Sequence, residues 1–230
     1  MITSLELFAG AGGLALGLEK AGFKTLALNE FDKNACQTLR HNRPDWNVIE
    51  GDIHDINFKG FDGKIDLLSG GFPCQAFSHS GKRLGFEDTR GTLFYEFARA
   101  IKEIKPTCFL AENVKGLLSH DNGNTIKTII DVFSDLGYFV FSPLLLNAND
   151  YEVAQKRERI FLFGVKKELK KEFTFNEPVK KNKITLRDIF EKNIYYSQPI
   201  PFSKGVNYSD SKRKIFEKIP PGGYWRSLNI

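Results

Sequence analysis

A cysteine preceded by a proline, Cys74, lies in the stretch GGFPCQAFSHSGKR. The run before it, KIDLLSG, is typical of a buried strand, so we expect the thiol on a loop beyond the carboxyl end of that strand. A structural cysteine more often lies inside an apolar segment, as Cys108 does in CFLAEN. This setting predicts a nucleophilic thiolate held near a phosphate chain by hydrogen-bonding and basic neighbours. Those neighbours are Gln75, Ser78, Lys82 and Arg83.

Glu112 and Asn113 end the next predicted strand, CFLAEN, so their side chains should emerge on the same rim as Cys74. A carboxyl group in a partly closed pocket can have a raised pKa and protonate a ring nitrogen. The segment QKRERI adds Arg157 and Arg159, whose alternate spacing puts both guanidinium groups on one face of a strand. The non-catalytic interpretations are a helix cap or surface pair for the first segment and a charged edge strand for the second.

A glycine-rich turn, LELFAGAGGLALG, places Gly10, Gly12 and Gly13 between the first predicted strand and the first predicted helix. Backbone N–H groups can approach a ligand closely at such a turn, which indicates a nucleotide-type cofactor. Glu30 follows at the tip of the second strand, where an acid can bind ribose hydroxyls. Because Gly10-x-Gly12-x-x-Ala15 also fits the dinucleotide fingerprint, an NAD-dependent oxidoreductase is an alternative, although it gives no role to Cys74.

Two further details favour a cofactor of a different shape. Phe31 follows the acid and offers an aromatic face to an adenine. The segment Gly51-Asp52-Ile53 ends the third strand with a carboxylate that can accept from an adenine amino group. Both features point into the crevice at the carboxyl ends of adjacent strands.

Strand-like runs alternate with helical patterns, which predicts an α/β fold with a mostly parallel sheet and helices on both faces. The expected strands are TSLELF, KTLALN, WNVIEGD, KIDLLSG, CFLAEN and YFVFSPLLL. The expected helices span about residues 13–21, 32–42, 92–105 and 124–136. A last strand, ERIFLFGV, is expected to be antiparallel or at an edge, because little chain separates it from its predecessor.

Composition places the chain of 230 residues, 41% of them hydrophobic, among globular proteins of one domain or a domain with a small appendage. It lacks a signal peptide and an apolar run of the roughly 18 residues that a membrane span needs, so we expect a cytoplasmic protein. The three cysteines have neither metal-ligand nor disulfide spacing, so no metal is expected. The formal charge of +5 suits a polyanionic partner, although many basic enzymes share it.

The sequence texture changes beyond Val165, where KKELKKEF and PVKKNK replace the alternating apolar segments. We therefore predict a catalytic domain over residues 1–165 and a basic linker with the start of a second region over 166–230. The basic stretch is either a solvated surface or a DNA-facing linker.

Six segments in fixed order now resemble the DNA cytosine-5 methyltransferases of bacterial restriction-modification systems. They are FAGAGG, Glu30 with Phe31, GDI, GFPCQ, ENV and QKRER, with RGTLF between the fourth and fifth. The resemblance covers residues 1 to about 165. It implies a Rossmann-like S-adenosylmethionine-dependent methyltransferase fold, with S-adenosylmethionine as cofactor and double-stranded DNA as partner.

The resemblance also implies the reaction. Cys74 would add to C6 of a flipped cytosine, which makes C5 nucleophilic toward the methyl group of the cofactor. Glu112 would bind N3 and the exocyclic amine, while Arg159 would hold O2 and Arg157 would support the loop or the adduct. The base that removes the C5 proton is left open.

Further contacts follow from the same resemblance. The implied cofactor residues are Phe8, Ala9, Gly10, Gly12 and Gly13 at the methionine part, Glu30 at the ribose, Phe31, Asp52 and Ile53 at the adenine, and Pro73 and Leu93 at the far wall. The implied DNA contacts are Gln75, Ser78, Lys82, Arg83 and Asn113.

Full-length members of that family continue into a target-recognition domain and an asparagine-bearing segment beside the cofactor. The stretch PPGGYWRSL resembles the opening of the recognition region in some members, so residues 166–230 are expected to hold a basic linker and the start of a truncated target-recognition region. We expect half of a two-subunit enzyme, a truncated gene product or an expressed fragment, with little sequence-specific methylation alone. The open crevice wall should be apolar and favour a second subunit or self-association. A non-catalytic assembly subunit that keeps cofactor binding is the remaining alternative.

Overall fold

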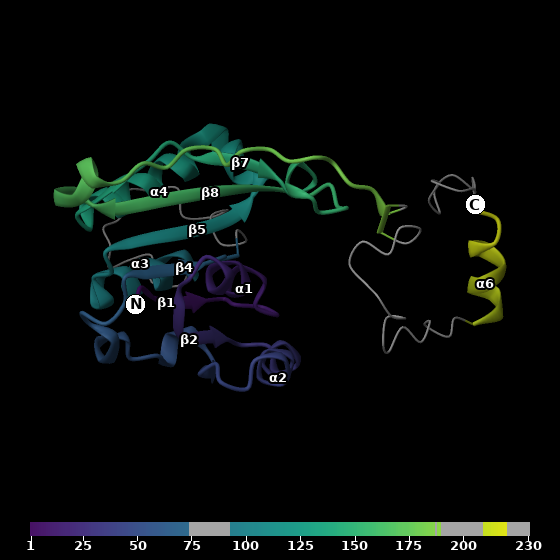
Figure 1. Cartoon of the computed structure of the whole chain (residues 1–230), viewed down its shortest axis with the longest axis horizontal. Helices are drawn as coiled ribbons and strands as arrows, with labels where there is room; N and C mark the ends of the chain where they lie inside the picture. The colour runs from purple at the N-terminus through teal and green to yellow at the C-terminus, as the bar shows by residue number, and fades with distance from the viewer. Residues whose placement is uncertain (74–92, 187, 190–208, 220–230) are drawn as a thin grey trace. The chain divides into compact units, whose positions relative to one another are not determined.

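The computed structural model describes residues 1–73, 93–186, 188–189 and 209–219, and the remaining residues are drawn in grey in Figure 1. The chain divides into two compact units, Met1–Thr185 and Leu186–Ile230, each of which is described by itself. In the second unit the described residues include helix α6 (Asp210–Phe216). The first unit holds the sheet.

The sheet has the strand order β3-β2-β1-β4-β5-β8-β6, with β7 also paired to β8. Strands β1 to β5 are parallel to one another, which confirms the mostly parallel sheet. The strands are β1 (Thr3–Leu7), β2 (Lys24–Glu30), β3 (Val48–Glu50), β4 (Leu67–Gly70), β5 (Cys108–Val114), β6 (Tyr138–Val140), β7 (Leu144–Asn147) and β8 (Glu158–Lys166). The strand order reverses between β1 and β4, which opens a crevice at their carboxyl ends.

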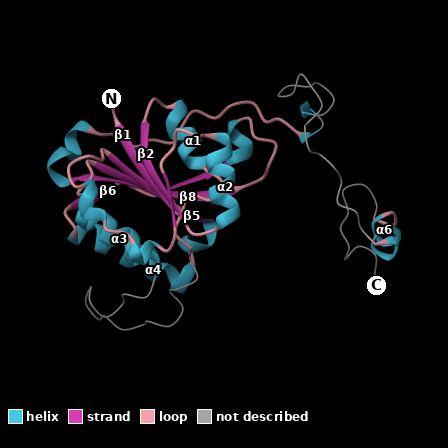
Figure 2. Ribbon diagram, turned by 90° about the horizontal axis from the view of Figure 1, so that it is seen from below, coloured by secondary structure: helices cyan, strands magenta, loops and turns pink. Residues whose placement is uncertain are grey.

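Helices cover both faces of the sheet, as predicted. Figure 2 shows α1 (Gly13–Lys20) and α2 (Lys33–Asn42) on one face, and α3 (Leu93–Ile104) and α4 (Asn124–Asp135) on the other. All four helices match their predicted ranges closely. None of the helices in the described ranges combines the length and the apolar character that crossing a bilayer requires.

An aromatic core lies between the sheet and helices α3 and α4. The rings of Phe109 and Phe133 have centroids 4.3 Å apart, and Phe94 lies 5.6 Å from Phe133. These three side chains are completely buried. Each such burial stabilises the fold by about 1.5–3 kcal/mol, so this face carries much of the driving force for folding.

Of the predictions about the last strands, one is wrong and one is confirmed. The run YFVFSPLLL is not one strand, because it is interrupted at residues 141–143 between β6 and β7. Pro143 has no N–H group to donate to a neighbouring strand, so the ladder breaks there. Strand β8 is antiparallel, as expected, but it is not at an edge, because it pairs with β5 on one side and with β6 and β7 on the other.

The stretch after β8 packs against the same sheet. The ring of Phe175 lies 4.9 Å from that of Phe163, and Phe173 packs beside them. Further along, the backbone N–H of Lys181 donates to the carbonyl of Asp150 at 2.8 Å. The first part of the basic stretch therefore belongs to the body of the first unit.

Candidate active site

The carboxyl ends of the central strands border a cavity of about 510 Å³. Its walls combine the glycine turn after β1 with the predicted acid and both predicted arginines. The lining residues are Glu6, Phe8, Ala9, Gly13, Leu14, Gly71, Glu112, Leu146, Ala148, Tyr151, Arg157, Arg159 and Phe161. Segments that are far apart in the sequence thus line one cavity.

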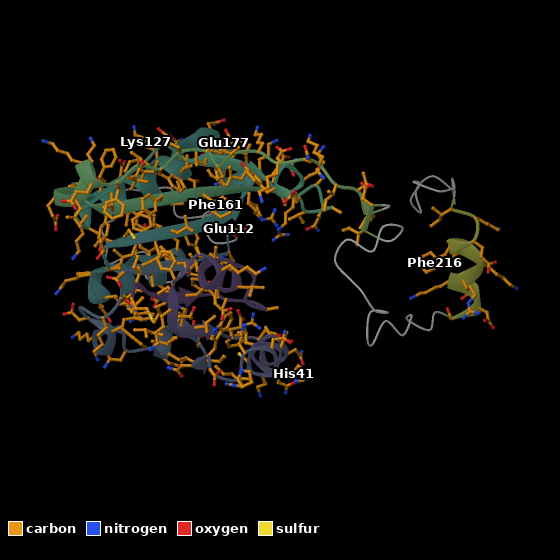
Figure 3. All side chains as sticks on the ribbon, viewed as in Figure 1. His41, Glu112, Lys127, Phe161, Glu177 and Phe216 are labelled. Atoms are coloured by element: carbon orange, nitrogen blue, oxygen red, sulfur yellow. The ribbon has the colours of Figure 1, made fainter. Side chains whose placement is uncertain are left out.

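Glu112 and Arg159 form an ion pair in this cavity. The Nε of Arg159 lies 2.9 Å from Oε1 of Glu112, and each side chain is about a quarter exposed. The pair forms because β5 and β8 run antiparallel, which puts Glu112 opposite Phe161 and Val114 opposite Arg159. Figure 3 shows Glu112 and Phe161 beside each other on these neighbouring strands. An acid and a cation therefore face the same space.

Gly71 allows the chain that leads to Cys74 to pass close to the acid. A Cβ atom at this position would lie 2.9 Å from Oε2 of Glu112, so a side chain here would displace the carboxylate. The predicted residues from Cys74 to Arg83 lie outside the described part of the chain.

Asn113 has a different environment from the one expected. Its side chain is 5% exposed, and its Nδ2 donates to the carbonyl of Phe72 at 2.9 Å. Its Oδ1 accepts from the backbone N–H of Val114 at 2.8 Å. These internal bonds favour a role in positioning the chain just before Cys74 over the expected contact with DNA.

The glycine turn has a constrained backbone. Phe8, Gly10 and Gly12 have positive φ angles of 57°, 54° and 83°. For Phe8, a bulky residue, this conformation is unfavourable and is typical of a functional turn. A Cβ atom on Gly12 would lie 2.6 Å from a side-chain carbon of Leu39, so this glycine is required for packing against α2.

Glu30 ties the glycine turn to the tip of β2. Its Oε2 accepts from the backbone N–H of Gly10 at 2.6 Å. Its Oε1 accepts from the backbone N–H groups of Phe31 and Asp32, both at 2.8 Å. A carboxylate has about four acceptor positions, so some capacity remains for a ribose hydroxyl.

The residues expected around the adenine lie at the ends of β2 and β3. Phe31 is 73% exposed, which leaves its ring free to stack on a base. Oδ1 of Asp52 accepts from the backbone N–H of His54 at 3.0 Å and lies 2.6 Å from its Nδ1. These hydrogen bonds hold the pKa of Asp52 below its usual range, so it is a ready acceptor. Ile53 is buried in the core, so its backbone is what it can offer to a ligand.

The predicted far wall is described only in part. Pro73 is exposed at the end of the described stretch, and Leu93 begins α3 and packs against the core. Neither residue is among those that line the cavity.

Glu6 is the most informative residue that the sequence prediction missed. It lies in β1, is 3% exposed and lines the cavity. Burial raises its pKa to about 8, although the hydroxyl of Ser69, 3.4 Å away, partly opposes this. The signal was present in the sequence, because an acid inside the apolar run SLELF must face a different surface from its neighbours. Other missed lining residues are Leu14, Gly71, Leu146, Ala148, Tyr151 and Phe161.

The described residues contain no group of three or more His, Cys, Asp or Glu side chains that could hold a metal ion. The polar groups of the cavity instead match an organic cofactor and a heterocyclic base: a turn of backbone N–H groups, a carboxylate and guanidinium groups.

Fold and site together define the class of α/β methyltransferases. Residues 2–224 match the family of C-5 cytosine-specific DNA methylases, and the chain belongs to this family. Members of the family use S-adenosylmethionine as their cofactor. This membership removes the NAD-dependent alternative.

Several relatives are known. The chain is 55% identical over 227 residues to the type II methyltransferase M.Eco47II of Escherichia coli, covering 98% of this chain and 54% of the relative. It is 54% identical over 227 residues to M.PspPI of a Psychrobacter species, covering 98% of this chain and 55% of the relative. The chain thus spans about half the length of these relatives.

Solved structures agree on the fold. A prophage-encoded Escherichia coli protein described as a DNA modification methyltransferase superposes with a TM-score of 0.68 at 28% identity, covering 97% of this chain and 66% of that chain. DNMT2 of Spodoptera frugiperda gives a TM-score of 0.62 at 22% identity, covering 79% of this chain and 56% of that one, and supports the fold alone.

Proposed function

We propose that this chain is the catalytic part of a cytoplasmic restriction-modification methyltransferase, which transfers a methyl group from S-adenosylmethionine to C5 of cytosine in double-stranded DNA. The observation that carries the proposal is the Glu112–Arg159 pair, which faces the same cavity as the glycine turn after β1. An acid and a cation there can hold the polar edge of a base while the turn binds the methyl donor. The relatives' family supports the same reaction.

The chemical problem is that C5 of cytosine is a poor nucleophile. In the proposed first step the thiolate of Cys74 forms a bond to C6, and the electron pair of the C5–C6 double bond moves toward the N3–C4 side of the ring. Glu112 then delivers a proton to N3, which neutralises the developing charge. The resulting enamine can attack at C5.

The cofactor supplies an electrophilic methyl group, which is transferred to C5 with S-adenosylhomocysteine as the leaving group. A base, whose identity is left open, then takes the C5 proton, and the electron pair of the C5–H bond re-forms the C5–C6 double bond as the bond between the Cys74 sulfur and C6 breaks. The thiolate is restored, and the N3 proton returns to Glu112. The target carbon is inaccessible inside stacked DNA, so the base must be flipped into the cavity.

Base binding requires the Glu112–Arg159 pair to open. In the structure Nε of Arg159 is directed at the carboxylate, and its Nη1 donates to the carbonyl of Glu158 at 2.8 Å. We propose that Arg159 turns to O2 of the base while Glu112 turns to N3 and the exocyclic amine. Arg157, which is exposed at the cavity mouth, remains available for the loop of Cys74 or for the adduct.

Covalent trapping tests the proposal. The chain is incubated with S-adenosylmethionine and duplex DNA of random sequence that contains 5-fluorocytosine, which blocks loss of the C5 substituent. We expect an adduct that survives denaturation, and we expect Cys74→Ser to abolish it while leaving cofactor binding measured by calorimetry unchanged. An adduct that survives in Cys74→Ser would contradict the assignment of the nucleophile.

We further propose that choosing a DNA sequence requires protein outside residues 1–230, because the chain matches about half of each relative. The trapping experiment is therefore repeated with any protein encoded beside this gene. An adduct that forms only with the neighbour would establish a two-subunit enzyme. Cofactor binding without an adduct in either arm would instead favour the non-catalytic assembly subunit.

A further inference from the structure

Arg99, in the middle of α3, contacts the turn that follows β3. Its Nη2 donates to the carbonyl of Ile53 at 2.9 Å, and its Nη1 donates to the carbonyl of Ile56 at 3.0 Å. Ile53 and Ile56 lie one and four positions after Asp52, the acid expected at the adenine edge. We call residues 52–56 the adenine turn, and one side chain on helix α3 thus holds its backbone.

Arg99 is itself held in place. Its Nε donates to Oε2 of Glu96 at 2.7 Å, and its Nη2 lies 2.6 Å from the same oxygen. The Glu96 side chain is only 9% exposed, so this pair is largely shielded from water. The guanidinium also lies over the buried ring of Phe58, with 4.6 Å between its central carbon and the ring centroid. The planar guanidinium group of arginine has several N–H donors in fixed positions, so it can hold two carbonyls and a carboxylate at once better than a lysine can.

Other anchors of the adenine turn are the side chain of Ile53, which is buried in the core, and the backbone N–H of Gly51, which donates to the carbonyl of Glu30 at 3.0 Å. The helical turn η1 (Ile53–Asp55) is short, and its internal bonds of 3.1 Å and 3.2 Å are long. On the other side of Asp52, the buried side chain of Asn29 donates to the carbonyl of Gly51 at 3.1 Å. The backbone before Asp52 is thus held by Glu30 and Asn29. The backbone after it is held by the buried Ile53 side chain and by Arg99.

Asp52 needs this support because it is exposed. Its side chain is 46% exposed, and within the described part of the chain its carboxylate contacts the backbone N–H and the ring of the neighbouring His54. Its orientation toward a ligand therefore depends on the backbone that carries it. Small displacements matter here, because a hydrogen bond weakens steeply when its geometry is lost.

We propose that Arg99 is a positioning residue that gives the site its selectivity for adenine, by holding the carbonyls of Ile53 and Ile56 so that Asp52 can accept from the 6-amino group. This inference rests on the proposed function, because it assumes that the cavity and the adjoining turn bind S-adenosylmethionine. Arg99 itself does not touch the cofactor in this proposal.

The test compares two ligands that differ at one position of the purine. S-adenosylhomocysteine carries the 6-amino donor, and S-inosylhomocysteine carries a carbonyl acceptor there. Calorimetry on the purified chain should show that the wild type prefers the first ligand by about 10- to 100-fold, the factor expected for a hydrogen bond to a charged group. In Arg99→Met and Arg99→Lys this ratio should fall toward one.

Two further variants keep the result interpretable. Arg43→Lys is the matched control, because Arg43 pairs with Glu19 at 3.0 Å on the surface of α1 and α2 and does not hold the adenine turn. It should keep the wild-type ratio. Glu96→Gln leaves Arg99 in place but weakens its anchor, so it should give an intermediate ratio even if the Arg99 variants fail to fold.

The outcomes separate the two proposals. If the wild type binds neither ligand, the proposed cofactor site is wrong, and the proposed role of Arg99 is wrong as well. If the wild type is selective and Arg99→Met keeps the full ratio of the two affinities, the positioning role of Arg99 is overturned while the proposed function stands. If Arg99→Met is unfolded, a full ratio in Glu96→Gln overturns the positioning role in the same way. Equal weakening of both ligands at an unchanged ratio would indicate a structural role alone.

Discussion

The two faces of the central strands differ sharply, although the same strands form both. Toward α3 and α4, β1 and β5 present Leu5, Leu7 and Phe109, which are buried in the aromatic core. Toward the cavity the alternate residues are Glu6 and Glu112. Because successive side chains of a strand point to opposite faces, one strand can carry stability on one side and chemistry on the other. Substitutions on the two faces should therefore have separable effects.

The largest effect on stability is expected on the core face. Phe109→Ala should lower the free energy of unfolding by about 3–5 kcal/mol, because it leaves a cavity beside Phe133 and Tyr138. Thermal unfolding followed by circular dichroism measures the loss. Phe31→Ala is the contrasting variant, since Phe31 is 73% exposed. Phe31→Ala should leave the melting temperature unchanged while weakening cofactor binding. Equal destabilisation by both variants would contradict the separation of stability from ligand binding.

On the cavity face, Glu112→Gln should reduce methyl transfer by about 10²- to 10⁴-fold, the usual contribution of a general acid. Its effect on stability should stay within about 1 kcal/mol, because the ion pair with Arg159 is partly exposed. Single-turnover transfer from labelled cofactor, with the remaining protein supplied if it is required, measures the rate. Glu158→Gln is the control, since its partner is the exposed Lys115, 3.1 Å away. If Glu158→Gln lost as much methyl transfer as Glu112→Gln, the assignment of Glu112 as the acid would be contradicted.

The smallest effect, counted per pH unit, concerns the pH dependence of stability. The pKa of Glu6 is raised by burial from 4.5 to about 8, so between these values the folded chain binds more protons at Glu6 than the unfolded chain does. This contribution to stability is complete below about pH 4.5 and is lost as the pH rises toward 8, with a slope of up to about 1.4 kcal/mol per pH unit.

Replacing this acid by an amide removes the titration. Melting curves of Glu6→Gln across this pH range, without cofactor, should therefore fall less steeply than those of the wild type. Glu19→Gln, which alters an exposed acid, is the control and should keep the wild-type slope. Parallel curves for Glu6→Gln and the wild type would show that Glu6 does not titrate in this window.

Much of the first unit was predictable because its signals are local. The ends of α1 and α2, the strand before Glu112 and the glycine turn all follow from residue type and short-range spacing. The proline that interrupts YFVFSPLLL was also a local signal, but the apolar run around it masked the break.

Other features depend on contacts between distant segments. The pairing of β8 on both sides required knowing which strands it meets, and the internal bonds of Asn113 required knowing that Phe72 lies beside it. Glu6 was missed because its strand is predictable from local sequence, whereas the far side of the cavity it faces is formed by residues more than a hundred positions away, from Glu112 to Phe161. Arg99 was not recognisable either, since nothing near it in sequence points to Ile53.

The ion pair between Glu112 and Arg159 forms only in one register of the antiparallel strands β5 and β8. If β8 slipped by one residue, its side chains would exchange faces, and either Glu158 or Ile160 would take the place of Arg159 beside Glu112. The first slip would bring two carboxylates together, and the second would remove the ion pair of the native register. The side chains that we propose to be catalytic thus also disfavour the nearest misfolded arrangements of the sheet, so selection for the proposed activity would at the same time be selection for the right register.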